Sequence, residues 1–229
     1  MGGWKRASQE WQDFNARWRY STEVPEPGQA IPTGVPGHYN LSLQTKNRVI
    51  YVRQSYADTY DYLWNAVSER QEGAIIRGQP KTGERSRLVF RLSKDLLTRR
   101  ILLVVGKTVF LWYCVIRLVQ DGQVVLLHTP ENSPLLFYHD TVYIRGTDPS
   151  LDQNPSNPLP IGSKEHMFIW SVFDLGDASQ PPYLAIGEKQ FFVQAPSPYS
   201  QLTQWMRGIH PFYYAGALPL WTREELHAA

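Results

Sequence analysis

Two short segments of this chain carry residues suited to holding phosphate groups. The first, Gly-Gln-Pro-Lys-Thr-Gly (78–83), follows the apolar run Ala74–Arg77, and the second, Gly-Lys-Thr (106–108), precedes another apolar run. In a phosphate-binding loop, glycines let successive backbone N–H groups point at the anion, and the following helix adds its positive N-terminal end. Lys107 would then contact the β- and γ-phosphates, and the Thr108 hydroxyl would bind Mg²⁺.

The two segments are halves of one motif separated by an insertion. Without the 23 residues Glu84–Gly106, the sequence reads Gly-Gln-Pro-Lys-Thr-Gly-Lys-Thr, a complete G-x-x-x-x-G-K-T between a predicted strand and a predicted helix. The predicted phosphate-binding residues are Gly78, Gln79, Pro80, Lys81, Thr82, Gly83, Gly106, Lys107 and Thr108.

The insertion differs from its surroundings in charge. It carries a net charge of +4, whereas the whole chain carries +2. Gly83-Glu84-Arg85 at its start can be translated from a splice-donor-like GGTGAGC, and Val105-Gly106 at its end from an acceptor-like GTAGGG. We therefore hypothesise that Glu84–Gly106 is translated from a retained, in-frame intron. The alternatives are a genuine basic surface insertion and a chance resemblance to the motif.

A carboxylate that could hold the same metal ion follows a later apolar segment. Met167–Phe173 predicts a buried strand, and Asp174 stands at its end. In phosphate-transferring proteins of this type, such an aspartate holds Mg²⁺ directly or through water. The alternative is that Asp174 only ends the strand at a turn. The predicted catalytic residues are Lys107 and Asp174, and the predicted metal ligands are Thr108 and Asp174.

Residues for the hydrolytic step are less clearly indicated. Leu175 follows Asp174, at a place where ATPases with this kind of motif often carry a catalytic glutamate. Asp177 or Glu188 could replace that glutamate, and Ser197 is a candidate contact for the γ-phosphate. Nucleotide binding is therefore a stronger expectation than hydrolysis.

The apolar pattern predicts the elements that would position these residues. Residues 1–22 form an aromatic amphipathic helix with Trp4, Ala7, Trp11, Phe14 and Trp18 on one face, which either packs on the main body or binds a protein partner. Residues 23–46 are a Pro/Gly-rich linker, and residues 47–229 form the nucleotide-binding domain. Its strands are expected at 47–53, 74–77, 123–128, 135–140, 141–144, 167–173 and 190–195, with helices at 56–67 and 107–119. Alternation of strands and helices favours an α/β fold with a mostly parallel sheet and flanking helices.

Composition excludes several other classes of protein. Apolar residues make up 42% of the 229 residues, which is a globular composition, and a net charge of +2 does not favour nucleic-acid binding driven by bulk charge. The single cysteine cannot form an intrachain disulfide. No signal peptide and no apolar run of the ~20 residues needed to span a membrane are present. We expect an intracellular protein, cytoplasmic or nuclear, without membrane contact.

Taken together, the interrupted loop, the strand after its helix and Asp174 resemble an additional-strand P-loop ATPase. More narrowly, residues 55–226 are similar to fungal Crinkler-like and retrotransposon-hot-spot-like NTPases, through 106–113, 124–129, 136–140, 195–198 and 218–226. The resemblance implies a P-loop NTPase with bound ATP and Mg²⁺ that acts on an attached effector domain. It also implies a truncated C-terminus, because a later sensor arginine and an effector domain are missing. The rival hypothesis is a non-enzymatic or degenerate interaction protein that uses the N-terminal helix and the basic insertion.

Overall fold

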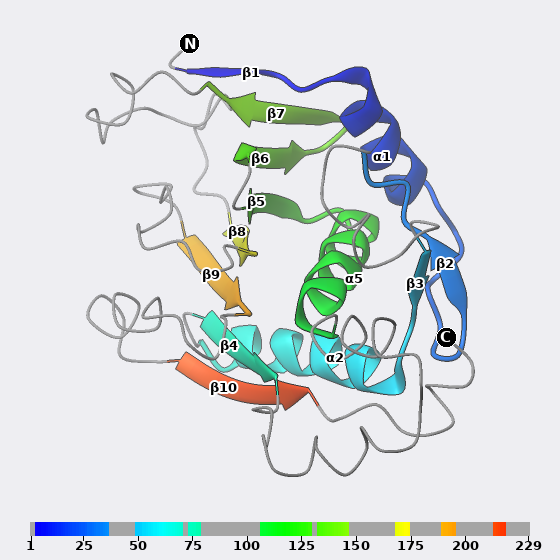
Figure 1. Cartoon of the computed structure of the whole chain (residues 1–229). Helices are drawn as coiled ribbons and strands as arrows, with labels where there is room; N and C mark the ends of the chain where they lie inside the picture. The colour runs from blue at the N-terminus through cyan, green and yellow to red at the C-terminus, as the bar shows by residue number, and fades with distance from the viewer. Residues whose placement is uncertain are drawn as a thin grey trace, which may run out of the picture.

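A large mixed β-sheet with helices forms the centre of the molecule (Figure 1). The structure is a computed structural model that describes residues 3–36, 49–70, 73–78, 106–129, 132–146, 168–174, 189–195 and 213–218. The helices are α1 (Gln9–Arg19), α2 (Gln54–Ser68) and α5 (Gly106–Gln120). The large sheet contains β1 (Trp4–Arg6), β4 (Gly73–Gly78), β5 (Val124–Thr129), β6 (Asn132–Tyr138), β7 (Thr141–Arg145), β8 (Phe168–Phe173), β9 (Lys189–Gln194) and β10 (Tyr213–Leu218). A small second sheet contains β2 (Ala30–Pro32) and β3 (Val49–Tyr51).

The large sheet has the strand order β1-β7-β6-β5-β8-β9-β4-β10. The pairs β5/β8, β8/β9, β9/β4 and β4/β10 are parallel, whereas β5/β6, β6/β7 and β7/β1 are antiparallel. The α/β class is therefore confirmed. The sheet is mixed, and the expected parallel arrangement is found for the strands β5, β8, β9, β4 and β10. The antiparallel part arises because β6 and β7 form a tight hairpin that adds to the edge at β5, as the sequence at 135–144 predicts.

Helix α5 lies at the centre of the core, on one face of the sheet (Figure 1). Nearly every described side chain from Val109 to Val119 is buried, because α1 and α2 cover the helix on the sides that the sheet leaves open. The helix ends where the sequence predicts a turn. Gly122 adopts φ +70°, a conformation that favours glycine, and the Gln123 N–H donates to the Leu118 carbonyl at 2.9 Å.

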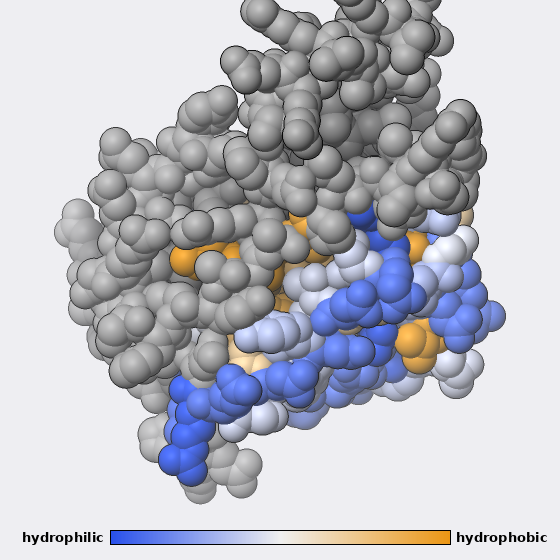
Figure 2. Space-filling model, turned by 90° about the horizontal axis from the view of Figure 1, so that it is seen from below, coloured by the Kyte–Doolittle hydropathy of each residue, from blue (hydrophilic) through white to orange (hydrophobic). Residues whose placement is uncertain are grey.

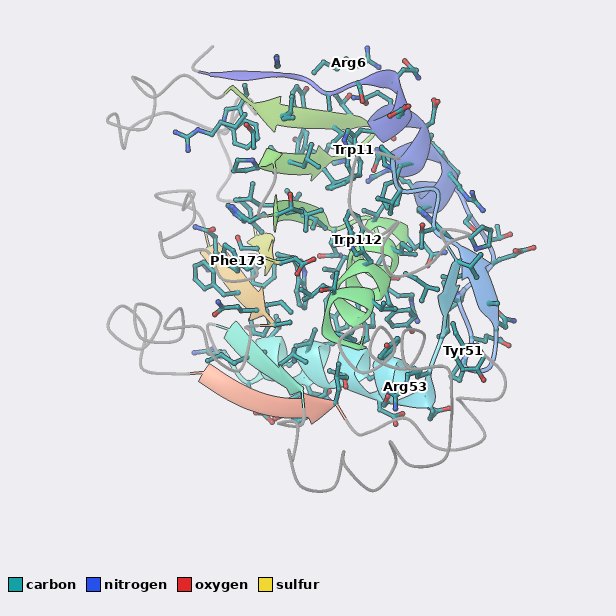
Figure 3. All side chains as sticks on the ribbon, in the orientation of Figure 1. Arg6, Trp11, Tyr51, Arg53, Trp112 and Phe173 are labelled. Atoms are coloured by element: carbon teal, nitrogen blue, oxygen red, sulfur yellow. The ribbon has the colours of Figure 1, made fainter. Side chains whose placement is uncertain are left out.

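The N-terminal segment is part of this core and not a separate extension. Trp11 stacks on Trp112 of α5 with ring centroids 6.2 Å apart (Figure 3). The Gln12 side chain pairs with the backbone of Val142, donating at 2.8 Å and accepting at 3.0 Å. Phe14 and Trp18, on the same face of α1, are also buried. The predicted helix over residues 1–22 is wrong for its first part, because Trp4 lies in β1 and is buried in a second cluster with Leu126 and Leu136. The aromatic stripe is thus occupied by the protein's own core, which leaves only the polar face of α1 for a partner.

The Pro/Gly-rich segment predicted as a linker contains regular structure. Ile31 of β2 pairs with Ile50 of β3, and both side chains are buried. The Thr33 carbonyl accepts a hydrogen bond of 2.8 Å from the Trp18 indole N–H. A proline at residue 32 is compatible with this arrangement because β2 is an edge strand of a two-stranded sheet. The expectation that residues 23–46 lack regular structure is therefore wrong at residues 30–32.

The outer face of α2 is hydrophilic, as Figure 2 shows from below. Its exposed residues are Gln54, Asp58, Asp61, Asn65 and Ser68. Across the described ranges, no helix combines the length and the apolar character that crossing a bilayer requires.

Candidate functional site

Thr108 and Asp174, which are 66 residues apart in the sequence, meet at one edge of the sheet. The Thr108 hydroxyl donates a hydrogen bond of 3.2 Å to Oδ1 of Asp174, and this contact is partly buried. Thr108 lies in the first turn of α5, and Asp174 is the first residue after β8. The two residues that the sequence predicts as metal ligands are therefore brought together.

Strand alternation explains why Asp174 points toward α5. Trp170 and Val172 of β8 lie in the same core cluster as the α5 side chains. Asp174 continues this alternation and therefore emerges on the same face of the sheet. Its backbone is held as well, because the Asp174 N–H donates to the His128 carbonyl of β5 at 2.8 Å. The position of the Asp174 carboxylate is therefore fixed by the sheet.

The first turn of α5 is positioned by buried apolar side chains. Val109 and Phe110, which directly follow Thr108, are buried in the main core cluster. The Phe110 ring contacts the Tyr56 ring of α2 edge-on, with centroids 5.8 Å apart. Because these contacts fix the rotation of α5, they also fix the direction in which the Thr108 hydroxyl points.

The remaining predicted site residues are distributed as follows. Gly78 is the last residue of β4, and Gly106 and Lys107 lie in the first turn of α5. β4 runs parallel to β9, and β9 runs parallel to β8, so β4 and β8 end at the same edge of the sheet. The predicted residues that lie outside the described ranges are Gln79, Pro80, Lys81, Thr82, Gly83, Asp177, Glu188 and Ser197.

The Thr108–Asp174 pair has a geometry that fits Mg²⁺. Magnesium takes six oxygen ligands at about 2.0–2.1 Å, so two adjacent ligand oxygens stand about 3 Å apart. The Thr108 hydroxyl and the Asp174 carboxylate oxygen are separated by 3.2 Å. Among the described residues, no group of three His, Cys, Asp or Glu side chains could form a metal cage. An ion held here would therefore complete its shell with water and phosphate oxygens, as magnesium usually does.

A buried row of three side chains, two of them polar, lies on the opposite face of the sheet. It was not predicted from the sequence. His128, Phe173 and Gln194 are register partners on β5, β8 and β9. Gln194 is 1% exposed, and its amide oxygen has no hydrogen-bond partner among the described residues. His128 is 2% exposed, and burial together with the positive charge of Arg145 lowers the pKa of its imidazole to about 3. The row follows from strand alternation, since apolar Val193 faces α5 and its neighbour Gln194 must face the other way.

Comparison with known proteins adds no family assignment. No protein-family model, no curated protein and no solved structure matches this chain.

Proposed function

We propose that this protein binds a purine nucleoside triphosphate, most simply ATP, together with Mg²⁺ at the sheet edge formed by β4, β8 and the first turn of α5. The observation that carries this proposal is the 3.2 Å contact between the Thr108 hydroxyl and Asp174. A G-K-T segment at a helix start and an aspartate after an apolar strand are separate sequence signals. Their meeting in space is what the shared binding of one metal ion requires.

The arrangement of the parallel strands supports the same proposal. In the order β5-β8-β9-β4-β10, strand β9 lies between β4, which leads into the predicted loop, and β8, which precedes Asp174. We interpret β9 as the additional strand that the resemblance to additional-strand P-loop ATPases implies. Ligands of open α/β sheets bind beyond the carboxyl ends of the strands, where Gly78 and Asp174 lie.

Each residue has a defined role in the proposed site. The α5 N-terminus and Lys107 attract the triphosphate, and the Lys107 ammonium balances charge on the β- and γ-phosphates. Thr108 and Asp174 hold the metal ion, which orients the phosphates and neutralises part of their charge. We assign no base for an attacking water. The proposed activity is therefore nucleotide binding, and hydrolysis of the nucleotide is to be measured separately.

Titration calorimetry with ATP in the presence and absence of Mg²⁺ tests this proposal. We expect saturable binding that weakens by at least about tenfold in Thr108→Ala and Asp174→Asn, because the first variant removes a ligand oxygen and the second removes the negative charge that attracts the cation. Thr108→Ser retains the hydroxyl and should retain the affinity.

Two matched substitutions control for general effects on the protein. Thr59→Ala makes the same change within α2, and Asp140→Asn neutralises an exposed carboxylate that pairs with Arg19. Neither should alter binding. Equal affinity of Asp174→Asn and the unaltered chain, with or without Mg²⁺, would exclude the proposed metal site.

A further inference from the structure

A second threonine lies beside Asp174 at the same edge of the sheet. Thr129 is the last residue of β5, and β5 is the parallel neighbour of β8 (Figure 1). His128 of β5 is the register partner of Phe173 of β8, and the Asp174 N–H donates to the His128 carbonyl at 2.8 Å. The next residues along the two strands, Thr129 and Asp174, are therefore neighbours across the sheet.

Thr129 and Asp174 also lie on the same face of the sheet. Val125 and Leu127 of β5 belong to the core cluster that contains the α5 side chains. Alternation along β5 places Thr129 on the face of these two residues, which is the face of Asp174 and Thr108. The pairing of β5 with β6 is irregular near this end, but the extra residue lies in β6, so the alternation of β5 is intact.

The Thr129 hydroxyl is a buried polar group with unused hydrogen-bonding capacity. Its Oγ1 atom is buried and has no hydrogen-bond partner within the ranges that the structure describes. Proteins rarely leave such an atom unpaired, because its lost hydration is then not replaced. The Thr108 hydroxyl, by contrast, donates to the Asp174 carboxylate at 3.2 Å. Two threonine hydroxyls therefore lie next to this carboxylate, and only that of Thr108 pairs with it directly.

The water shell of a magnesium ion offers a partner for the Thr129 hydroxyl. Mg²⁺ keeps several water ligands when a protein supplies one or two oxygens. A water molecule whose oxygen faces the cation directs its hydrogens outward and donates them to nearby acceptors. A threonine oxygen accepts such a bond without adding charge to the site. Partners of this kind orient the groups around a metal ion and raise its affinity.

We propose that Thr129 is a positioning residue of the proposed Mg²⁺ site, and that its Oγ1 atom accepts a hydrogen bond from a water molecule of the metal shell. Thr108 and Asp174 hold the ion itself, and Thr129 orients its water from the neighbouring strand. The inference rests on the proposed function, because it concerns the same metal site.

Calorimetric titration with ATP at a series of Mg²⁺ concentrations tests this role. Thr129→Val keeps the shape of the side chain and removes the hydroxyl, whereas Thr129→Ser keeps the hydroxyl. Thr141→Val makes the same change in β7 at the opposite edge of the sheet and serves as the matched control. We expect Thr129→Val to raise the Mg²⁺ concentration that gives half of the increase in ATP affinity by about tenfold. Its affinity for ATP without Mg²⁺ should not change, and Thr129→Ser and Thr141→Val should behave like the unaltered chain.

Two further measurements separate this role from a purely structural one. In the Asp174→Asn background, Thr129→Val should have no additional effect on the Mg²⁺ dependence, because both residues act on the same ion. In urea without ligand, Thr129→Val should unfold at the same concentration as the unaltered chain or at a higher one, because it removes an unpaired buried hydroxyl. A lower unfolding midpoint together with weaker ATP binding in the absence of Mg²⁺ would show a structural role and overturn the inference.

The remaining outcomes distinguish this inference from the proposed function. If Thr129→Val keeps the normal Mg²⁺ dependence while Asp174→Asn loses it, the role of Thr129 is refuted and the proposed site stands. If Asp174→Asn also keeps the normal Mg²⁺ dependence, both proposals fail. Thr129→Ala removes the same hydroxyl and is held to the same tenfold criterion if Thr129→Val does not fold.

Discussion

The buried histidine on β5 predicts a specific dependence of stability on pH. His128 is 2% exposed, its ring stacks on Phe173 with centroids 4.6 Å apart, and within the described part of the chain its Nε2 has no hydrogen-bond partner. Burial is the main cause that lowers its pKa to about 3, and the nearby positive charge of Arg145 adds to it. In the unfolded chain the same imidazole has a pKa of about 6.5. Between these two values, the unfolded state binds a proton that the native state does not bind.

The sign and size of the effect follow from this difference. The contribution of His128 to stability is complete above pH 6.5 and decreases as the pH falls toward the native pKa of about 3. At about pH 5, protonation of this one side chain stabilises the unfolded state by about 2 kcal/mol. The loss reaches about 4 kcal/mol near pH 3, which is a large part of the stability of a typical domain.

Urea unfolding at about pH 8 and about pH 5 measures this loss. The test compares the unaltered chain with His128→Phe, which cannot take up a proton but retains a ring to stack on Phe173. We expect the unaltered chain to lose about 2 kcal/mol more than His128→Phe between the two pH values. His139→Gln, which removes an exposed histidine in the β6–β7 turn, should behave like the unaltered chain. If His128→Phe keeps the full pH dependence, the imidazole is not held neutral and the explanation from burial fails.

Three further predictions concern the core. Trp11→Ala should lower the free energy of unfolding in urea by about 3–5 kcal/mol, since the indole packs against α5; a loss below about 1 kcal/mol would mean that α1 is only peripherally attached. Tyr60→Phe should cost about 1 kcal/mol by removing the hydrogen bond of 2.7 Å to Asp121, and unchanged stability would argue against that bond. Burial raises the pKa of the Cys114 thiol, so a thiol reagent should modify it only after unfolding. Rapid modification of the native protein would show that this part of α5 is accessible.

Much of the sheet could be predicted from local sequence. The apolar segments of β5, β8 and β9 each lie within one or two residues of their predicted positions, because strands buried on both faces read as continuous apolar runs. Asp121-Gly122 marked the end of α5 because glycine adopts the positive φ that ends a helix. Asp174 could be singled out because a polar residue directly after such a strand is easily recognised.

Other features depend on contacts that local sequence does not encode. β1 is three residues long and pairs with β7, which is about 140 residues away, so no local periodicity could reveal it. β2 was obscured by the surrounding prolines and glycines, although Ile31 finds a partner in β3. The burial of Gln194 could not be predicted because it depends on which face of β9 turns away from α5.

The pairing of the first strand with β7 sets an order of events during synthesis. Trp4 pairs with Arg145, so the ribosome must add about 140 residues before β1 can join the sheet. At ~5–20 residues per second, this takes roughly 7–28 s. During that interval Trp4 and Trp11 have left the ribosome without the sheet and helix that later bury them. The nascent chain therefore presents an aromatic segment that chaperones can bind, and conditions that slow translation prolong its exposure.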